Sequence, residues 1–128
     1  MKHLKFMLIL VVLFTVNVFA GSVGFGITLP AFQGTTYLVN TKTTNTAKSS
    51  VSLNLNGSVR DTVVVDTMPE VRVSCIAPSI IAVEGGGLVT VDYYSASNGT
   101  TGTVVSHVFR SYNYNWGSYS ISGNLNYY

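Results

Sequence analysis

The chain offers few side chains that could act as a nucleophile, a base or a metal ligand. It has one cysteine, Cys75, and two histidines, of which His3 lies in the N-terminal segment and His107 in the body of the sequence. A thiol and an imidazole within hydrogen-bonding distance form the dyad of cysteine hydrolases. Cys75 and His107 are therefore the pair from which this sequence could build a nucleophilic site.

The surroundings of both residues favour packing over chemistry. Cys75 alternates with Val71 and Val73, which predicts a strand with the thiol on its buried face, and such a cysteine is usually inert. An intermolecular disulfide is the alternative if the thiol is exposed, because a single cysteine cannot form one within the chain. His107 shares a strand face with Phe109, where a lone histidine is more often a hydrogen-bonded core residue than a base. We expect no enzyme.

The sequence predicts neither a metal centre nor a pair of catalytic carboxylates. Zinc needs three or four Cys, His or carboxylate ligands, and calcium needs closely spaced acidic ligands. The five acidic residues of this chain are dispersed. Asp61 and Asp66 would point to opposite faces of one strand, which argues against a glycosidase. We therefore expect no metal and no cofactor.

Aromatic side chains are concentrated in the last third of the sequence, where the single tryptophan and every tyrosine except Tyr37 lie. In the segment from Tyr112 to Trp116, three rings alternate with two amides, so an extended backbone would place the rings on one face. Such rings stack on sugars or form association surfaces, and the alternative is cross-strand packing within the sheet. The predicted ligand-binding residues are Tyr112, Tyr114, Trp116 and Tyr119.

The first twenty residues have the layout of a secretory signal peptide. A basic lead precedes the apolar run from Phe6 to Phe14, and Val18 and Ala20 offer small residues at the positions that a signal peptidase recognises. The run is shorter than the roughly 20 residues that cross a bilayer, so a retained membrane span is less favoured. Cleavage after Ala20 would leave one domain, residues 21–128. We expect this domain to be secreted or held at the cell surface.

The charge of the expected mature chain excludes a nucleic-acid partner. Two of the seven basic residues, Lys2 and Lys5, lie in the leader, and all five acidic residues follow it, so the mature chain has no formal net charge. Its basic residues are spread singly along the sequence. Nucleic-acid binding requires several cations clustered on one face.

Alternating apolar and polar residues predict strands along the mature chain, and no stretch after residue 20 has a helical period. About eight short strands with turn signals between them predict an all-β fold, either a single antiparallel β-sandwich or a small barrel. Asn56-Gly57 predicts a hairpin into the strand that follows, and Gly85-Gly86-Gly87 predicts another. Asn56 and Asn98 also begin N-glycosylation acceptor patterns, so each marks either a modified residue or a simple turn.

Segments near both ends of the chain carry a resemblance to a known group. They are Gly24 to Pro30, the Thr- and Lys-rich stretch Thr41 to Ser50, Asn115-Trp116, and Tyr119 to Gly123. In these segments the chain resembles small secreted β-proteins of Gram-positive bacteria related to the lactococcin-like bacteriocin group. The resemblance implies a sandwich that acts at a cell envelope, as an antibacterial or its accessory protein. The uncharged mature chain departs from the His-rich character of that group.

The first and last predicted strands are also similar to parts of chaperone-assembled pilins. The alternation from Val23 to Leu29 resembles a donor strand, and Gly117 to Tyr128 resembles a final strand, which such subunits exchange to build fibres. Two functions are therefore expected. The first is a non-catalytic binding module whose partner is a cell-envelope polysaccharide or protein, and the alternative is a self-assembling fibre subunit.

Overall fold

The computed structural model describes residues 22–57 and 60–128, which form an all-β domain as predicted. The predicted signal peptide, residues 1–20, lies outside the described residues. The elements in chain order are β1 (Ser22–Leu29), β2 (Thr36–Thr41), β3 (Lys48–Leu53), β4 (Thr62–Pro69), β5 (Ile80–Val83), β6 (Val89–Asp92), the short 3₁₀ helix η1 (Ala96–Gly99), β7 (Val104–Ser111) and β8 (Tyr119–Asn126).

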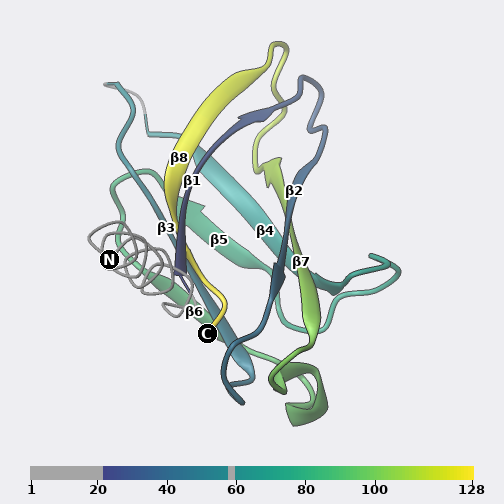
Figure 1. Ribbon diagram of the computed structural model, residues 1–128. Helices are drawn as coiled ribbons and strands as arrows, with labels where there is room; N and C mark the ends of the chain where they lie inside the picture. The colour runs from purple at the N-terminus through teal and green to yellow at the C-terminus, as the bar shows by residue number, and fades with distance from the viewer. Residues whose placement is uncertain (1–21, 58–59) are drawn as a thin grey trace, which may run out of the picture.

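The strands form two antiparallel sheets that face each other (Figure 1). Sheet A has the order β1-β8-β3-β6, and sheet B has the order β2-β7-β4-β5. This pair of orders is the jelly-roll arrangement, in which the chain moves back and forth between the sheets. The predicted β-sandwich is confirmed, and its two separate sheets distinguish it from a closed barrel.

Consecutive strands lie in opposite sheets at every connection except that between β4 and β5. The hairpin predicted at Asn56-Gly57 is therefore wrong, because β3 and β4 belong to different sheets. The hairpin predicted at Gly85-Gly86-Gly87 is wrong for the same reason, since β5 and β6 do not pair. Gly57 and Gly87 do have the positive φ angles of turn glycines, 88° and 91°. Both connections, from β3 to β4 and from β5 to β6, lead from one sheet to the other instead of folding a strand back on its neighbour.

The segment between β4 and β5 is a loop, and the strand predicted from Val71 to Cys75 is wrong. Val71 is 75% exposed and Val73 is 77% exposed, so the apolar alternation does not mark a buried face here. Arg72 has a φ angle of 54°, which interrupts an extended backbone, and its guanidinium lies 3.7 Å from the centroid of the Tyr37 ring. Cys75 is exposed, contrary to the predicted buried position.

The hydrophobic core lies between the two sheets. Phe25 from sheet A and Phe109 from sheet B pack against each other in this core, with ring centroids 5.0 Å apart. The other buried core residues come from strands of both sheets: Leu29, Val51, Leu53, Val63, Val65, Ile80, Ala82, Ile121 and Leu125. Burial of such side chains stabilises each by about 1.5–3 kcal/mol relative to an exposed position. This core fixes the strands from which the surface loops extend.

The N-terminal strand β1 is an edge strand of sheet A that is already fully paired within its own chain. Its register with β8 runs from Ser22 opposite Asn126 to Leu29 opposite Tyr119. Phe25 and Leu29 anchor it in the core. Exchange of β1 between subunits would therefore first require the loss of these pairings and of this buried surface.

Candidate functional site

Two loops at one end of the sandwich carry an exposed aromatic cluster. The β1–β2 loop contributes Phe32, and the β7–β8 loop contributes Tyr114 and Trp116. The two loops lie side by side at the top of Figure 1. The ring centroids are 5.8 Å apart for Phe32 and Tyr114, 6.2 Å for Phe32 and Trp116, and 5.1 Å for Tyr114 and Trp116. We call these three residues the aromatic tip.

The rings of the aromatic tip remain open to solvent although they contact one another. Phe32 is 60% exposed, Tyr114 55% and Trp116 80%. Each ring contacts the other two in a tilted or edge-to-face geometry, which is favourable for aromatic pairs. A contiguous group of exposed rings differs from single exposed apolar residues, because such groups typically mark interaction sites.

Asn115 joins the two loops that carry the aromatic tip. Its carbonyl oxygen accepts a hydrogen bond from the Phe32 backbone at 2.6 Å, and its Oδ1 accepts one from the Gln33 backbone at 2.7 Å. Its Nδ2 donates to the carbonyl oxygens of Pro30 at 2.8 Å and Gly117 at 3.0 Å. These hydrogen bonds connect the backbones of the two loops and so fix the positions from which the rings extend.

The β1–β2 loop also has a strained backbone. Phe32 and Gln33 have φ angles of 61° and 54°, in the left-handed region that side chains other than glycine rarely adopt. Each such residue costs on the order of 1–3 kcal/mol and persists only where the surroundings impose it. The side chain of Gln33 supplies part of that constraint, because its Nε2 donates to the carbonyl oxygen of Tyr112 at 3.1 Å.

The structure brings two of the four predicted ligand-binding residues into the aromatic tip, Tyr114 and Trp116. Tyr112 is 51% exposed but belongs to none of the ring pairs of the described residues. Tyr119 begins β8 and packs against the core, where burial raises its pKa. The segment from 112 to 118 is a loop, so the extended stripe of rings does not form.

Phe32 is the member of the aromatic tip that the sequence pattern does not indicate. Its only local signal is a large ring within a turn, between Pro30 and Gly34. The residue that fixes its backbone, Asn115, lies far along the chain in a different loop. No periodicity within either segment predicts that contact.

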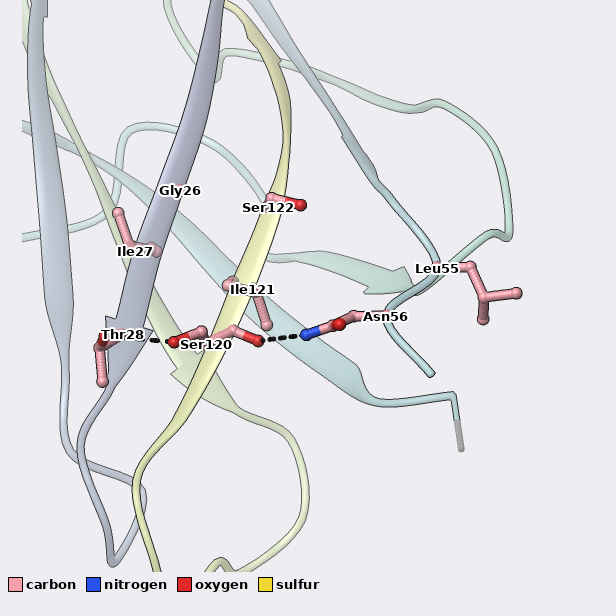
Figure 2. A pocket seen from close by; sticks show the side chains of 8 residues that line it. All are labelled: Gly26, Ile27, Thr28, Leu55, Asn56, Ser120, Ile121 and Ser122. Atoms are coloured by element: carbon pink, nitrogen blue, oxygen red, sulfur yellow. Dashed lines mark hydrogen bonds between the residues drawn. The ribbon is translucent and has the colours of Figure 1, made fainter. Parts of the chain in front are cut away.

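A shallow hollow of about 390 Å³ lies on the solvent side of sheet A (Figure 2). It is formed by β1, β8 and the chain that follows β3, and we define it by Gly26, Thr28, Leu55, Asn56, Ser120 and Ser122. Asn56 Nδ2 donates to the carbonyl oxygen of Ser120 at 3.2 Å, and the hydroxyls of Thr28 and Ser120 are 3.4 Å apart. No charged residue lines the hollow.

His107 is a buried, hydrogen-bonded residue, as predicted. It has no exposed surface, and its Nε2 lies 2.9 Å from Ser49 Oγ, which lies 2.6 Å from the hydroxyl of Tyr93. Burial, and then the positive charge of Lys42, lower the pKa of His107 to about 3. The imidazole is therefore neutral at physiological pH and faces the inside of the sandwich.

Cys75 lies in a different environment, on the exposed loop between β4 and β5. Partial desolvation, and then the negative charge of Asp66, raise the pKa of its thiol above 9.0. A raised pKa lowers the fraction of thiolate, which is the nucleophilic form.

We expect the thiol of Cys75 to react with a maleimide in the folded protein, at a rate that His107→Gln leaves unchanged. The reason is that Cys75 is exposed while His107 is engaged with Ser49 inside the sandwich. The measurement is the rate of maleimide addition to the native protein and to the folded variant. A clearly slower reaction in the variant would show that the imidazole activates the thiol, as the Cys75–His107 dyad would require.

The two candidate glycosylation residues lie in different settings. Asn56 is exposed and lines the hollow, whereas Asn98 is half-buried within η1. Among the residues that the structure describes, no group of three or more His, Cys, Asp and Glu side chains is placed to hold a metal ion. Within residues 22–57 and 60–128, no helix is long and apolar enough to cross a membrane.

Comparison with known proteins identifies no family. No protein-family model and no curated protein matches the sequence. Among solved structures, the chain is similar to the crystal structure of the Yersinia pseudotuberculosis-derived mitogen, with 13% identity, a TM-score of 0.46 and coverage of 80% of this chain and 83% of that one. A similarity of this size gives no information on function. The resemblances to the bacteriocin group and to pilins therefore stay predictions. The functional argument rests on the structure itself, a β-sandwich with an exposed aromatic tip.

Proposed function

We propose that this chain is a non-catalytic binding module that acts outside the cell or at its surface and contacts polysaccharide through the aromatic tip. The observation that carries the proposal is the set of three exposed rings in mutual contact, Phe32, Tyr114 and Trp116. Aromatic rings provide large, rigid contact area and dominate the energetics of many binding sites.

The way the aromatic tip is held supports a binding role over a packing role. The hydrogen bonds of Asn115 and Gln33 fix the two loops while the rings stay exposed. Binding to a preformed surface avoids the entropy cost of ordering loops and side chains. Strained backbone at Phe32 and Gln33 is also typical of ligand-binding loops.

The other parts of the proposal rest on separate features. The signal-peptide pattern of residues 1–20 supports the location outside the cell. The burial of His107 and the raised pKa of Cys75 support the absence of nucleophilic catalysis. Polysaccharide is favoured over nucleic acid because the expected mature chain has no net charge. Self-assembly by exchange of β1 stays a second hypothesis that no contact among the described residues favours.

We expect Trp116→Ala and Tyr114→Ala each to weaken retention on polysaccharide about tenfold or more, as for other exposed aromatic anchors. The measurement is depletion of the protein from solution by insoluble cellulose, chitin and bacterial peptidoglycan. Tyr94→Ala is the matched control, because Tyr94 is 71% exposed and forms no ring pair among the described residues. Equal retention of all three variants would remove the aromatic tip from the proposal.

A further inference from the structure

Gly26, in the middle of β1, has no structural reason to be glycine. Its φ angle lies outside the left-handed region, and a Cβ atom at this position would meet nothing within 4 Å. Glycine in a strand costs roughly 0.5–1 kcal/mol relative to alanine. Gly123 on the adjacent strand is different, because a Cβ atom there would lie 2.0 Å from the carbonyl oxygen of Ser52. Interior strand glycines are often found where a ligand or another backbone approaches closely, so the surroundings of Gly26 decide whether it marks such a place.

The position of Gly26 shows where that molecule would approach. Gly26 lines the hollow, next to Thr28 on the same strand and opposite Ser122 on β8 (Figure 2). The volume of about 390 Å³ lies within the range of small-molecule sites. Any larger side chain at Gly26 would occupy this space.

The chemistry of the lining is that of a site for an uncharged, hydroxylated ring. Thr28, Ser120 and Ser122 offer hydroxyls that both donate and accept hydrogen bonds, and Asn56 offers an amide that does the same. Leu55, which is 55% exposed, adds an apolar side for C–H groups. A charged ligand would lose hydration here without gaining an ionic partner. Neutral sugars match this lining, because they combine hydroxyls with apolar ring faces.

The hollow lies near the ends of β1 and β8 that lead into the two loops of the aromatic tip. Thr28 pairs with Ser120 in the register of β1 and β8. Phe32 follows Thr28 by four residues, and Trp116 precedes Ser120 by four residues. Four extended residues span at most about 13 Å, which is within reach of a short run of sugar rings. The spacing along the chain therefore places the hollow within the length of a short run of sugar rings from the aromatic tip.

From these observations we infer that the hollow binds an uncharged sugar ring of the polysaccharide whose other rings contact the aromatic tip. The inference rests on the proposed function and adds to it the class of ligand, a neutral polysaccharide. It also assigns a role to Gly26, which leaves room for that ring.

The test compares Gly26→Val with Gly24→Val. Both glycines lie on the exposed face of β1, but Gly24 lies outside the hollow, and a Cβ atom there would make only an ordinary contact with Asn124 at 3.7 Å. On whichever of cellulose, chitin and peptidoglycan retains the parent chain, we expect Gly26→Val to weaken retention about tenfold or more, since the hydrogen bonds in the hollow are lost. Gly24→Val is expected to bind like the parent chain.

The outcomes distinguish failure of the inference about the hollow from failure of the proposed function. Normal retention of folded Gly26→Val together with loss in Trp116→Ala overturns the inference and leaves the proposed function standing. Equal losses in Gly24→Val and Gly26→Val also overturn it, because the effect would then belong to the whole strand. Retention of the parent chain on none of the three polysaccharides overturns both. Should Gly26→Val fail to fold, Asn56→Ala replaces it, and retention equal to that of the parent chain overturns the inference.

Discussion

Lowering the pH from 6.5 to 3 is expected to reduce the free energy of unfolding by on the order of 4 kcal/mol through one side chain, His107. Burial and the nearby charge of Lys42 lower its pKa from 6.5 to about 3 in the folded protein. Between these values the unfolded chain holds a proton on the imidazole that the folded chain does not hold. The contribution is therefore complete above pH 6.5 and is lost progressively as the pH falls toward 3.

The groups around His107 explain why its imidazole is hard to protonate in the folded state. Its Nε2 is hydrogen-bonded to the hydroxyl of Ser49. The same hydroxyl is hydrogen-bonded to the hydroxyl of Tyr93. The nearby cation, Lys42, is 1% exposed and donates to the carbonyl oxygens of Tyr127 and Tyr128. An imidazolium would place a second positive charge beside this ammonium inside the sandwich. Typical domains are stable by only about 5–15 kcal/mol, so this effect alone is a large part of the total.

The measurement is urea unfolding at a series of pH values between 6.5 and 3, with His107→Gln as the control. Glutamine replaces the imidazole with an amide, which can still form a hydrogen bond with Ser49 but does not titrate. The difference between the two stability profiles is expected to change by about 1.4 kcal/mol per pH unit. Parallel profiles would show that His107 takes up its proton equally well in the folded state.

Gly123→Ala is expected to lower the free energy of unfolding by about 3 kcal/mol or more, at the upper end for an overpacked site. A Cβ atom at Gly123 would lie 2.0 Å from the carbonyl oxygen of Ser52 and 3.0 Å from the Cα atom of Leu53. Both are backbone atoms of the neighbouring strand β3, so no side-chain rotation can relieve the contact. Strands β3 and β8 would have to separate in the centre of sheet A.

The control for this prediction is Gly26→Ala, the same substitution in the same sheet. A Cβ atom at Gly26 meets nothing within 4 Å, so stability is expected to stay the same or to rise by about 0.5 kcal/mol. Thermal and urea unfolding of the two variants measure the difference. A Gly123→Ala variant as stable as Gly26→Ala would mean that β3 and β8 are not as close as the structure places them.

Residue alternation predicted the first and last strands but not the partners of strands in the sheets. The alternation from Val23 to Leu29 corresponds to β1, and the final strand predicted within Gly117 to Tyr128 corresponds to β8. Gly57 has the positive φ angle that the Asn56-Gly57 pattern favours. A local pattern cannot show whether the next strand joins the same sheet or the opposite one. In a jelly roll the next strand usually joins the opposite sheet, so both hairpin predictions were wrong.

The same limit applies to the candidate site. The concentration of Tyr and Trp indicated the segment that carries Tyr114 and Trp116, which are 55% and 80% exposed. The pattern could not supply Phe32, because its contact with Trp116 joins two loops at opposite ends of the sequence. Cys75 was misplaced for a related reason: valine alternation resembles a buried strand, but Arg72 bends the chain into a turn.

The place of β8 between β1 and β3 has a consequence for biosynthesis. In sheet A, β1 is joined to the β3–β6 pair through β8, which comes after all the other strands of the sheet in the chain. During translation, β1 and β3 remain without their common neighbour until residues 119–126 have emerged, and such long-range pairing is slow. Sheet A is therefore completed only after the last strand of the described chain has been made, so its assembly falls at the end of synthesis.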